Sequence, residues 1–280
     1  MVEITQHDFV VTLLLNRPTA RNALSVELCD AIVEGLEEIN RIDDARVLVI
    51  AGAGPVFCSG ADFAAVSGPD GVDFLPVFER MLEAVARNRL ATIARVQGAA
   101  LGGGLQLATV CDFRVIADDA KLAIPSSKLG VVVNLENVER LVNLIGVGPA
   151  KEILMAGRTV EGKGAAMLGL ATEVVAASEL EKHVERLASE IAALAPLSIQ
   201  GSKRAIQLVL DERSVRKGSS ASDRLDDRVR KDSDRLDDRA RKKVGAVEID
   251  ALVAEAYSSE DLAEGIRALR EKRPPEFRGR

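Results

Sequence analysis

The first half of the chain alternates between short apolar runs and segments whose apolar residues recur at helical spacing. Residues 9–15 predict a strand that ends before Pro18, because proline cannot continue a strand ladder. Ser25 can cap the next segment, in which apolar side chains recur every three or four residues over residues 28–39. The continuous apolar run at residues 47–51 is typical of a strand covered on both faces.

The same alternation continues through residue 117. A helix is expected over residues 75–88, followed by a strand at residues 92–97. A glycine-rich turn and a short helix then lead to another strand at residues 113–117. Strands that alternate with helices in this way favour the α/β class of folds.

From residue 148 onward, helical patterns dominate, and a single strand is expected at residues 172–175. The expected helices cover residues 149–156, 161–168, 178–194, 197–210 and 259–271. We therefore expect two parts, a core over residues 1–200 and a C-terminal helical region over residues 201–280.

The C-terminal region contains a charged 11-residue tandem repeat at residues 222–243. Its two copies, residues 222–232 and 233–243, match at nine of 11 positions, and their apolar residues stand four apart. A period of 11 is close to three helical turns, which favours a solvated helix with opposite charges along its length. A partner-binding or coiled-coil helix and a disordered segment remain as alternatives.

Charge and hydropathy limit the partners of the protein. The 280 residues include 37 basic and 43 acidic side chains, so the formal charge of −6 argues against a nucleic-acid partner. The apolar runs have the length of strands and predict no membrane span. The first residues lack the basic and apolar regions of a secretory signal, so a cytoplasmic location is expected. Basic residues gather in the last segment, residues 267–280, where an anionic ligand is expected to bind.

Few side chains are available for catalysis. The two histidines, His7 and His183, lie in polar surroundings and are expected to be solvated. Cys29, Cys58 and Cys111 have no metal-binding or redox spacing, so no metal site is expected. An enzyme of this composition would depend on carboxylates or on backbone dipoles.

Two glycine turns follow successive predicted strands. Gly102, Gly103 and Gly104 stand at a strand-to-helix junction, where unsatisfied N–H groups and the helix dipole can stabilise an oxyanion. Close packing of the backbone is the alternative reason for these glycines. A second turn at residues 57–62, with the sequence FCSGAD, directly follows the buried strand. Two such turns could direct two N–H donors at one carbonyl oxygen.

These turns and four other motifs resemble the crotonase superfamily, also called the enoyl-CoA hydratase/isomerase family. The other motifs lie at residues 15–24 (LNRP and RNAL), 124–130 (IPSSKLG), 146–158 and 271–280 (EKRPPEFRGR), in the order typical of the family. The resemblance implies an α/β spiral of ββα units with a C-terminal helical region, assembled as a homotrimer or as a hexamer formed by two trimers.

The resemblance also implies an acyl-CoA ligand and no permanently bound cofactor. It places the two oxyanion N–H donors at Ala61 and Gly103. The residues expected along coenzyme A are Asn22, Ala23, Leu24, Gly60, Asp62, Lys272, Arg273 and Phe277. For Phe277, packing of the chain end is the alternative.

The sequence departs from hydratases of the family where their two catalytic glutamates stand. These positions hold Gln106 and Ser126, and neither side chain is a base by itself. A later position that carries a carboxylate in related isomerases corresponds to Asn134. Possible substitutes are Glu136 and Glu139, although their spacing is also that of helix-surface residues. Asp62 is another candidate, but it is expected to brace its turn.

Two functions therefore stand open. One is binding of fatty acyl-CoA with little or no hydratase activity, in a carrier or regulator of lipid metabolism. The other is an active enoyl-CoA isomerase, hydrolase or atypical hydratase that uses another carboxylate.

Overall fold

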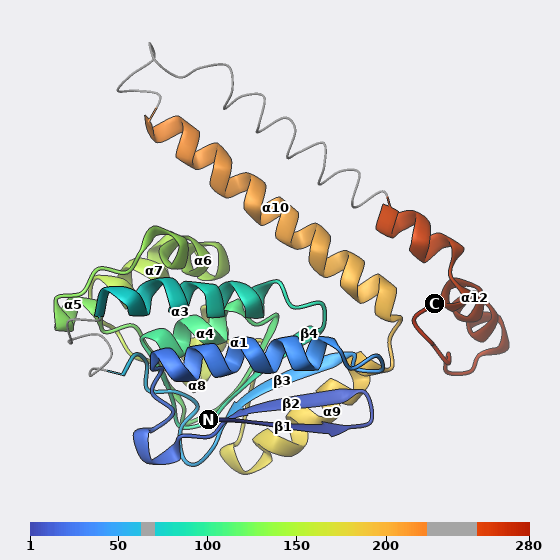
Figure 1. Ribbon diagram of the computed structural model, residues 1–280, viewed down its shortest axis with the longest axis horizontal. Helices are drawn as coiled ribbons and strands as arrows, with labels where there is room; N and C mark the ends of the chain where they lie inside the picture. The colour runs from blue at the N-terminus through green and yellow to red at the C-terminus, as the bar shows by residue number, and fades with distance from the viewer. Residues whose placement is uncertain (63–70, 223–250) are drawn as a thin grey trace. The chain divides into compact units, whose positions relative to one another are not determined.

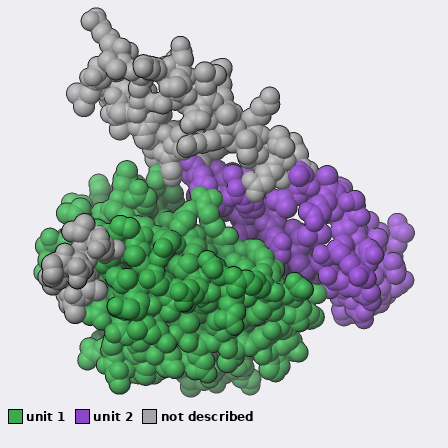
Figure 2. Space-filling view, in the orientation of Figure 1, with its two compact units in different colours: residues 1–192 green, residues 193–280 purple. Residues whose placement is uncertain are grey.

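The computed structural model describes residues 1–62, 71–222 and 251–280. The chain forms two compact units, residues 1–192 and residues 193–280, which Figure 2 shows in green and purple. The tandem repeat lies outside the described residues, except for its first residue, Ser222.

A six-stranded sheet forms the centre of the first unit. Its strands are β1 (Val2–His7), β2 (Val10–Leu15), β3 (Val47–Gly52), β4 (Ala91–Val96), β6 (Phe113–Ala117) and β9 (Glu173–Val175), in the order β1-β2-β3-β4-β6-β9. Only β1 and β2 pair antiparallel, and the other neighbours are parallel. Every residue of β3 is buried, as its apolar run predicts. All five strands expected for this sheet are present, whereas the edge strand β1 was not predicted.

Helices cover this sheet on both sides. Helices α1 (Val26–Asn40) and α3 (Gly71–Ala86) lie side by side on one face, and α9 (Leu180–Ala192) lies on the other (Figure 1). Ser25 caps α1 as expected, because its side chain accepts a hydrogen bond from the Leu28 N–H at 3.3 Å. The closely packed sheet and helices form the apolar core of the unit.

A smaller three-stranded sheet lies beside the glycine turns. It consists of β5 (Ala99–Leu101), β7 (Lys121–Ala123) and β8 (Val160–Glu161), in the order β5-β7-β8. Strands this short carry too few residues for a recognisable alternating pattern. The remaining elements of the unit are η1 (Pro18–Ala20), α4 (Gly103–Val110), α5 (Ser126–Leu129), α6 (Leu135–Ile145), α7 (Val147–Leu154), α8 (Gly162–Met167) and η2 (Ala177–Glu179).

The described part of the second unit is mainly helical. It contains α10 (Pro196–Ser222), a helical stretch at residues 251–258 and α12 (Glu260–Glu271), followed by an irregular tail at residues 273–280. Among all described helices, none is both long and apolar enough to cross a membrane.

Candidate functional site

The FCSGAD turn lies between two neighbouring segments of the first unit. On one side, the Cys58 N–H donates to the Ala99 carbonyl at 3.1 Å, and the Leu101 N–H donates to the Cys58 carbonyl at 3.0 Å. These bonds attach the turn to β5, the strand that leads into the glycine triplet. The two glycine turns are therefore joined through the backbone, as their positions after successive strands predict.

On its other side, the turn pairs with the segment that precedes α1. The Leu24 N–H donates to the Gly60 carbonyl, and the Asp62 N–H donates to the Leu24 carbonyl, both at 2.8 Å. In this parallel bridge, Leu24 bonds to the residues before and after Ala61, so the N–H of Ala61 points away from Leu24. No described residue accepts a hydrogen bond from the Ala61 N–H.

Glycine allows the second donor, Gly103, to approach this turn. Gly60 has φ +100°, and a Cβ atom there would lie 2.7 Å from the Leu101 carbonyl oxygen and 3.5 Å from the Gly103 nitrogen. Gly102 has φ +52° and directs the chain into α4. Gly103 is the first residue of that helix, and its N–H likewise has no acceptor within the described ranges. Two unpaired N–H donors in neighbouring turns can stabilise a developing oxyanion.

For Gly104, the third glycine of the triplet, the alternative explanation applies, because its lack of a side chain allows close packing of the backbone. A Cβ atom at Gly104 would lie 2.4 Å from the Cys58 carbonyl oxygen, closer than side chains pack. Cys58 is fully buried, and this burial raises the pKa of its thiol to about 12. The thiol is therefore protonated at neutral pH and is no nucleophile, although it lies beside the turns.

The side chain of Asn22 is buried rather than exposed beside the turns. Its exposed fraction is 0%, and its amide is hydrogen-bonded entirely within the protein. Leu24 is also fully buried, whereas Ala23 is partly exposed. Asp62 forms an ion pair with Arg17, with 3.3 Å between Oδ2 and Nη2. Of the residues expected along coenzyme A, these four thus lie in one hydrogen-bonded region with Gly60.

The two positions of the missing glutamates carry half-buried neutral side chains. Gln106 lies in the first turn of α4, three residues after Gly103. Ser126 is the first residue of α5. Within the described residues, neither side chain hydrogen-bonds to another protein group, so neither has a partner that would make it a base.

The possible substitute carboxylates lie on α6. Glu136 is exposed in the first turn of this helix, and Glu139 is partly buried one turn further. Asn134 caps the same helix, because its Oδ1 accepts a hydrogen bond from the Asn137 N–H at 3.1 Å. The structure thus gives Asn134 a local structural role.

Glu79 on α3 is a carboxylate that the sequence patterns did not single out. Its Oε1 accepts hydrogen bonds from Asn134 Nδ2 at 2.8 Å and from Asn137 Nδ2 at 2.5 Å. Its Oε2 pairs with Arg140 Nη1 at 3.2 Å. These contacts attach α6 to α3, and donors already occupy both oxygens of the carboxylate. Nothing in the sequence distinguishes Glu79 from an ordinary surface residue of its helix.

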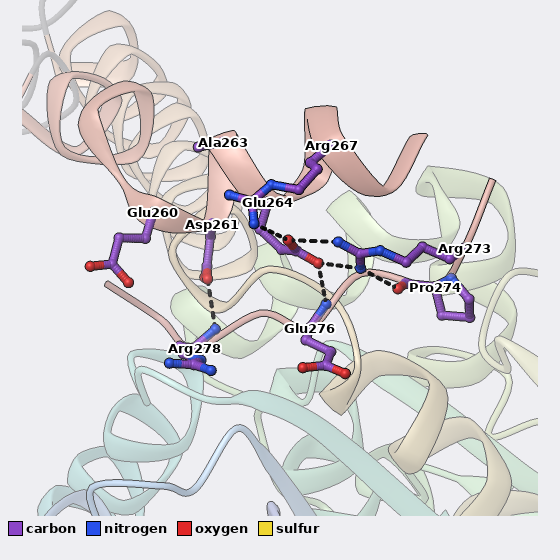
Figure 3. Close-up of a pocket in the computed structure, with 9 residues that line it drawn as sticks. All are labelled: Glu260, Asp261, Ala263, Glu264, Arg267, Arg273, Pro274, Glu276 and Arg278. Atoms are coloured by element: carbon purple, nitrogen blue, oxygen red, sulfur yellow. Dashed lines mark hydrogen bonds and ion pairs between the residues drawn. The ribbon is translucent and has the colours of Figure 1, made fainter. Parts of the chain in front are cut away.

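The C-terminal tail is anchored by carboxylates of α12 (Figure 3). Glu264 binds the Arg273 guanidinium through both oxygens, at 2.6 and 3.0 Å, and accepts a hydrogen bond from the Glu276 N–H at 3.1 Å. These bonds, above all the one from Arg273, lower the pKa of Glu264 to about 2, and Glu264 raises the pKa of Arg273 in turn. A second carboxylate, Asp261, is 3% exposed and accepts hydrogen bonds from the backbone N–H groups of residues 278 and 279 at 2.6 and 2.8 Å.

The three tail residues expected to contact coenzyme A differ in their surroundings. Arg273 is already bound to Glu264 and Glu271, whereas Lys272 is exposed in a left-handed conformation with φ +54°. Phe277 is partly buried, with its ring near Gly265, which agrees with packing of the chain end. A pocket beside these residues is lined by Glu260, Asp261, Ala263, Glu264, Arg267, Arg273, Pro274, Glu276 and Arg278.

The two histidines have different environments. His7 is 94% exposed, as expected, but the expectation of a solvated His183 is wrong. The side chain of His183 is 16% exposed, and its Nε2 lies 2.5 Å from Glu173 Oε2 on β9. Glu173 lies ten residues away, so no local pattern reveals the pair. Across the described residues, no group of three His, Cys, Asp or Glu side chains could hold a metal ion.

These observations define an α/β protein in which two glycine turns present backbone N–H donors. The profile of the Enoyl-CoA hydratase/isomerase family matches residues 5–237. The chain belongs to the enoyl-CoA hydratase/isomerase family, and the resemblance seen in its motifs is confirmed.

Individual relatives extend the match along the chain. The Mycobacterium leprae (strain TN) protein named "Probable enoyl-CoA hydratase echA6" is 32% identical over 283 residues, which cover 100% of both chains. "Enoyl-CoA isomerase/hydratase fer4" of Mycosarcoma maydis is 35% identical over 211 residues, 71% of this chain and 77% of the relative. The crystal structure of an enoyl-CoA hydratase/carnithine racemase from Magnetospirillum magneticum has a TM-score of 0.80 at 27% identity and covers 100% of this chain and 96% of that one. The expected crotonase-like α/β fold is therefore confirmed.

Proposed function

We propose that this protein binds fatty acyl-CoA thioesters and has little or no hydratase activity. The thioester oxygen is held between the N–H groups of Ala61 and Gly103. The observation that carries this proposal is the combination of two unpaired backbone donors with neutral side chains at Gln106 and Ser126. The donors are suited to binding, whereas the neutral side chains remove the means of moving a proton.

The chemistry of hydration explains why these replacements matter. Backbone donors stabilise a polarised carbonyl without exchanging a proton, and one such donor can contribute about 3 kcal/mol to a transition state. Addition of water to a double bond also needs a base for the water and an acid for the carbon. A glutamine amide cannot accept that proton, and Ser126 has no basic partner among the described residues.

The rest of the ligand site follows from the same proposal. The burial of Asn22 and Leu24 means that contacts of coenzyme A with this segment come from backbone groups and from Ala23. In the second unit, Lys272 is an exposed cation of the kind that binds phosphates, while Arg273 holds the tail in shape through Glu264. Phe277 helps to hold the tail in place by packing its ring near Gly265.

An active isomerase, hydrolase or atypical hydratase is the alternative function. Its best support is Glu139, which is partly buried on α6. Glu136 is more exposed, and Glu79 already uses both carboxylate oxygens for helix packing. In this alternative the substitute base is one of the two carboxylates of α6, of which Glu139 is the more buried.

Calorimetric titration and a turnover assay test the proposal. Long-chain acyl-CoA is titrated into the wild type and into the Gln106→Glu/Ser126→Glu variant, with free coenzyme A as the reference ligand. Hydration of a short enoyl-CoA is followed by the loss of its ultraviolet absorbance. We expect acyl-CoA to bind both proteins, and only the variant to hydrate the enoyl-CoA.

A control variant, Gln106→Glu/Ser127→Glu, adds the same charge but places the second carboxylate one residue away, on an exposed position. It should not hydrate the substrate. Rapid hydration by the wild type would contradict the proposal, and its loss in Glu139→Gln would establish the alternative. Absence of acyl-CoA binding would contradict both functions.

Assembly and location complete the proposal. We propose a homotrimer or a hexamer formed by two trimers, in the cytoplasm. The three cysteines are all buried and none of them forms a disulfide, which agrees with a reducing compartment. Light scattering of the purified protein tests the assembly, and a monomeric mass would contradict it.

A further inference from the structure

Two carbonyl groups of the loop before the FCSGAD turn and the carbonyl group of Phe57, the first residue of the turn, converge on one buried amide. Asn22 Nδ2 donates to the carbonyl oxygens of Ala53, Val56 and Phe57 at 2.9, 3.0 and 3.1 Å. Asn22 Oδ1 accepts a hydrogen bond from the Arg17 N–H at 3.0 Å. The residue itself has a left-handed φ of +54°, a conformation that asparagine tolerates better than most residues.

The side chain of Arg17 continues this network to the opposite end of the same turn. Its Nη1 donates to the Ala23 carbonyl at 2.7 Å, and its Nη2 contacts Asp62 Oδ2 at 3.3 Å. Arg17 and Asp62 are 24% and 26% exposed, so water screens this ion pair only in part. Arg17 thus joins the residues that flank the Leu24–Ala61 bridge on both strands.

We propose that Asn22 and Arg17 are positioning residues that set the direction of the Ala61 N–H. This inference rests on the proposed function, in which that N–H binds the thioester oxygen. Gly103 is oriented by α4, but Ala61 lies in an irregular turn without a helix to orient it. Asn22 fixes the loop that enters the turn, and Arg17 fixes its exit through Asp62. We call the contacts of Asn22 and Arg17 with the two ends of the turn the brace. Oxyanion donors act by being held in place before the ligand arrives, so the brace should increase the polarisation of the thioester carbonyl.

Amide hydrogen exchange tests the brace without any ligand. The Leu24 and Ser59 amides bond across the bridge, to Gly60 and Arg21, and report on its opening. In Arg17→Met we expect their exchange to accelerate by roughly tenfold or more, because hydrogen bonds of a charged group are lost. The Cys58 amide, bound to Ala99 on the other side, should change less.

The matched control is Arg89→Met. Arg89 also holds two backbone carbonyls, those of Ile42 and Ala45 at 2.7 and 3.4 Å, but away from the turn. It should leave the exchange of Leu24 and Ser59 unchanged. If Arg17→Met folds poorly, Arg17→Lys takes its place. Lysine keeps the charge but lacks the planar guanidinium that reaches both Ala23 and Asp62, so the amide exchange of Leu24 and Ser59 should accelerate to an intermediate extent.

A chromophoric ligand connects the brace with the donor. A cinnamoyl-CoA with a para-dimethylamino group absorbs at longer wavelength when its thioester carbonyl is polarised. We expect the wild type and Arg89→Met to produce the same red shift on binding. In Arg17→Met and Asn22→Ser the shift should fall to less than about half, while affinity changes less because most ligand contacts remain.

The outcomes separate this inference from the proposed function. A full red shift in both Arg17→Met and Asn22→Ser, or unchanged exchange at Leu24 and Ser59, would overturn the positioning role. If the wild type bound the ligand without a red shift, or did not bind it, the proposed function would fail. If the proposed function failed but the exchange of Leu24 and Ser59 still accelerated in Arg17→Met, the brace would stand as a structural feature of the turn. The inference that it positions a donor for a thioester would be rejected.

Discussion

The Ala61 turn and the C-terminal tail are both irregular segments that side chains hold in place, but they are held by different means. The turn is held chiefly by the neutral amide of Asn22, which is 0% exposed. The tail is held largely by the ion pair of Glu264 and Arg273, whose side chains are 16% and 36% exposed. The comparison shows how the position of a segment determines the chemistry that can anchor it.

The energetic consequences of the two anchors differ. Removing a buried donor leaves carbonyl groups that water cannot easily reach, and each such group costs about 1–3 kcal/mol. Removing one member of a solvent-accessible ion pair leaves a group that water can solvate, and salt screens the pair from the start. The hydrogen bonds of Asn22 should therefore be insensitive to salt and costly to remove, whereas the ion pair of the tail should weaken with salt and cost less to remove.

The Asn22→Leu substitution should produce the largest effect. Three carbonyls lose their donor, so we expect the free energy of unfolding to fall by about 3 kcal/mol or more. Urea denaturation measures this change, with Asn143→Ala as the control on an exposed position of α6. The control should stay within about 0.5 kcal/mol of the wild type. A loss below about 1 kcal/mol in Asn22→Leu would show that the loop does not depend on this amide.

Gly60→Ala should have the next largest effect. The new Cβ would lie 2.7 Å from the Leu101 carbonyl oxygen at φ +100°, which should cost about 1–3 kcal/mol and displace Ala61. We expect thermal unfolding at a lower temperature and a weaker acyl-CoA affinity. Gly201→Ala is the contrast, because no atom lies within 4 Å of its added Cβ and helix α10 should gain up to about 1 kcal/mol. If Gly60→Ala and Gly201→Ala had the same unfolding temperature and acyl-CoA affinity, the predicted clash of a Cβ atom at residue 60 would be wrong.

Much of the fold, but little of the anchoring, could be predicted from the sequence. The strand at residues 47–51 and the helix capped by Ser25 follow from local patterns, because apolar periodicity and caps act over a few residues. Strands β5, β7 and β8 are too short to produce such a pattern. Their pairing is decided by contacts between distant segments.

The candidate site shows the same division. The two glycine turns could be recognised in the sequence, the family resemblance placed the donors at Ala61 and Gly103, and the structure brings the turns together. The burial of Asn22 could not be foreseen, because its three carbonyl partners lie more than 30 residues away and are backbone groups. For Arg273, the nearby Glu271 is a local acidic partner, but its main partner, Glu264, lies nine residues away on α12 and is not marked by any local pattern.

Glu264→Gln should release the tail with little effect on the first unit. The neutral amide cannot replace the two-oxygen contact with Arg273, so the Glu276 amide should lose protection from hydrogen exchange. The urea midpoint of the first unit should not move. Glu255→Gln, at an exposed position of the second unit, is the control and should leave Glu276 protected. Unchanged protection in Glu264→Gln would mean that Asp261 anchors the tail by itself.

The smallest expected effect is a pH dependence confined to the tail. The folded-state pKa of Glu264, about 2, lies below the ordinary value of 4.5, so its contribution to anchoring is complete above pH 4.5 and is lost as the pH falls through about 2. The ¹³C chemical shift of the Glu264 carboxyl carbon reports this titration directly and should stay nearly constant from about pH 5 to about pH 3. In Arg273→Gln the main cause of the low pKa is absent, so the same carboxyl should titrate within that range. A wild-type midpoint near 4.5 would show that the ion pair is too exposed to hold the carboxylate ionised, and the contrast with the neutral amide at Asn22 would then be sharper still.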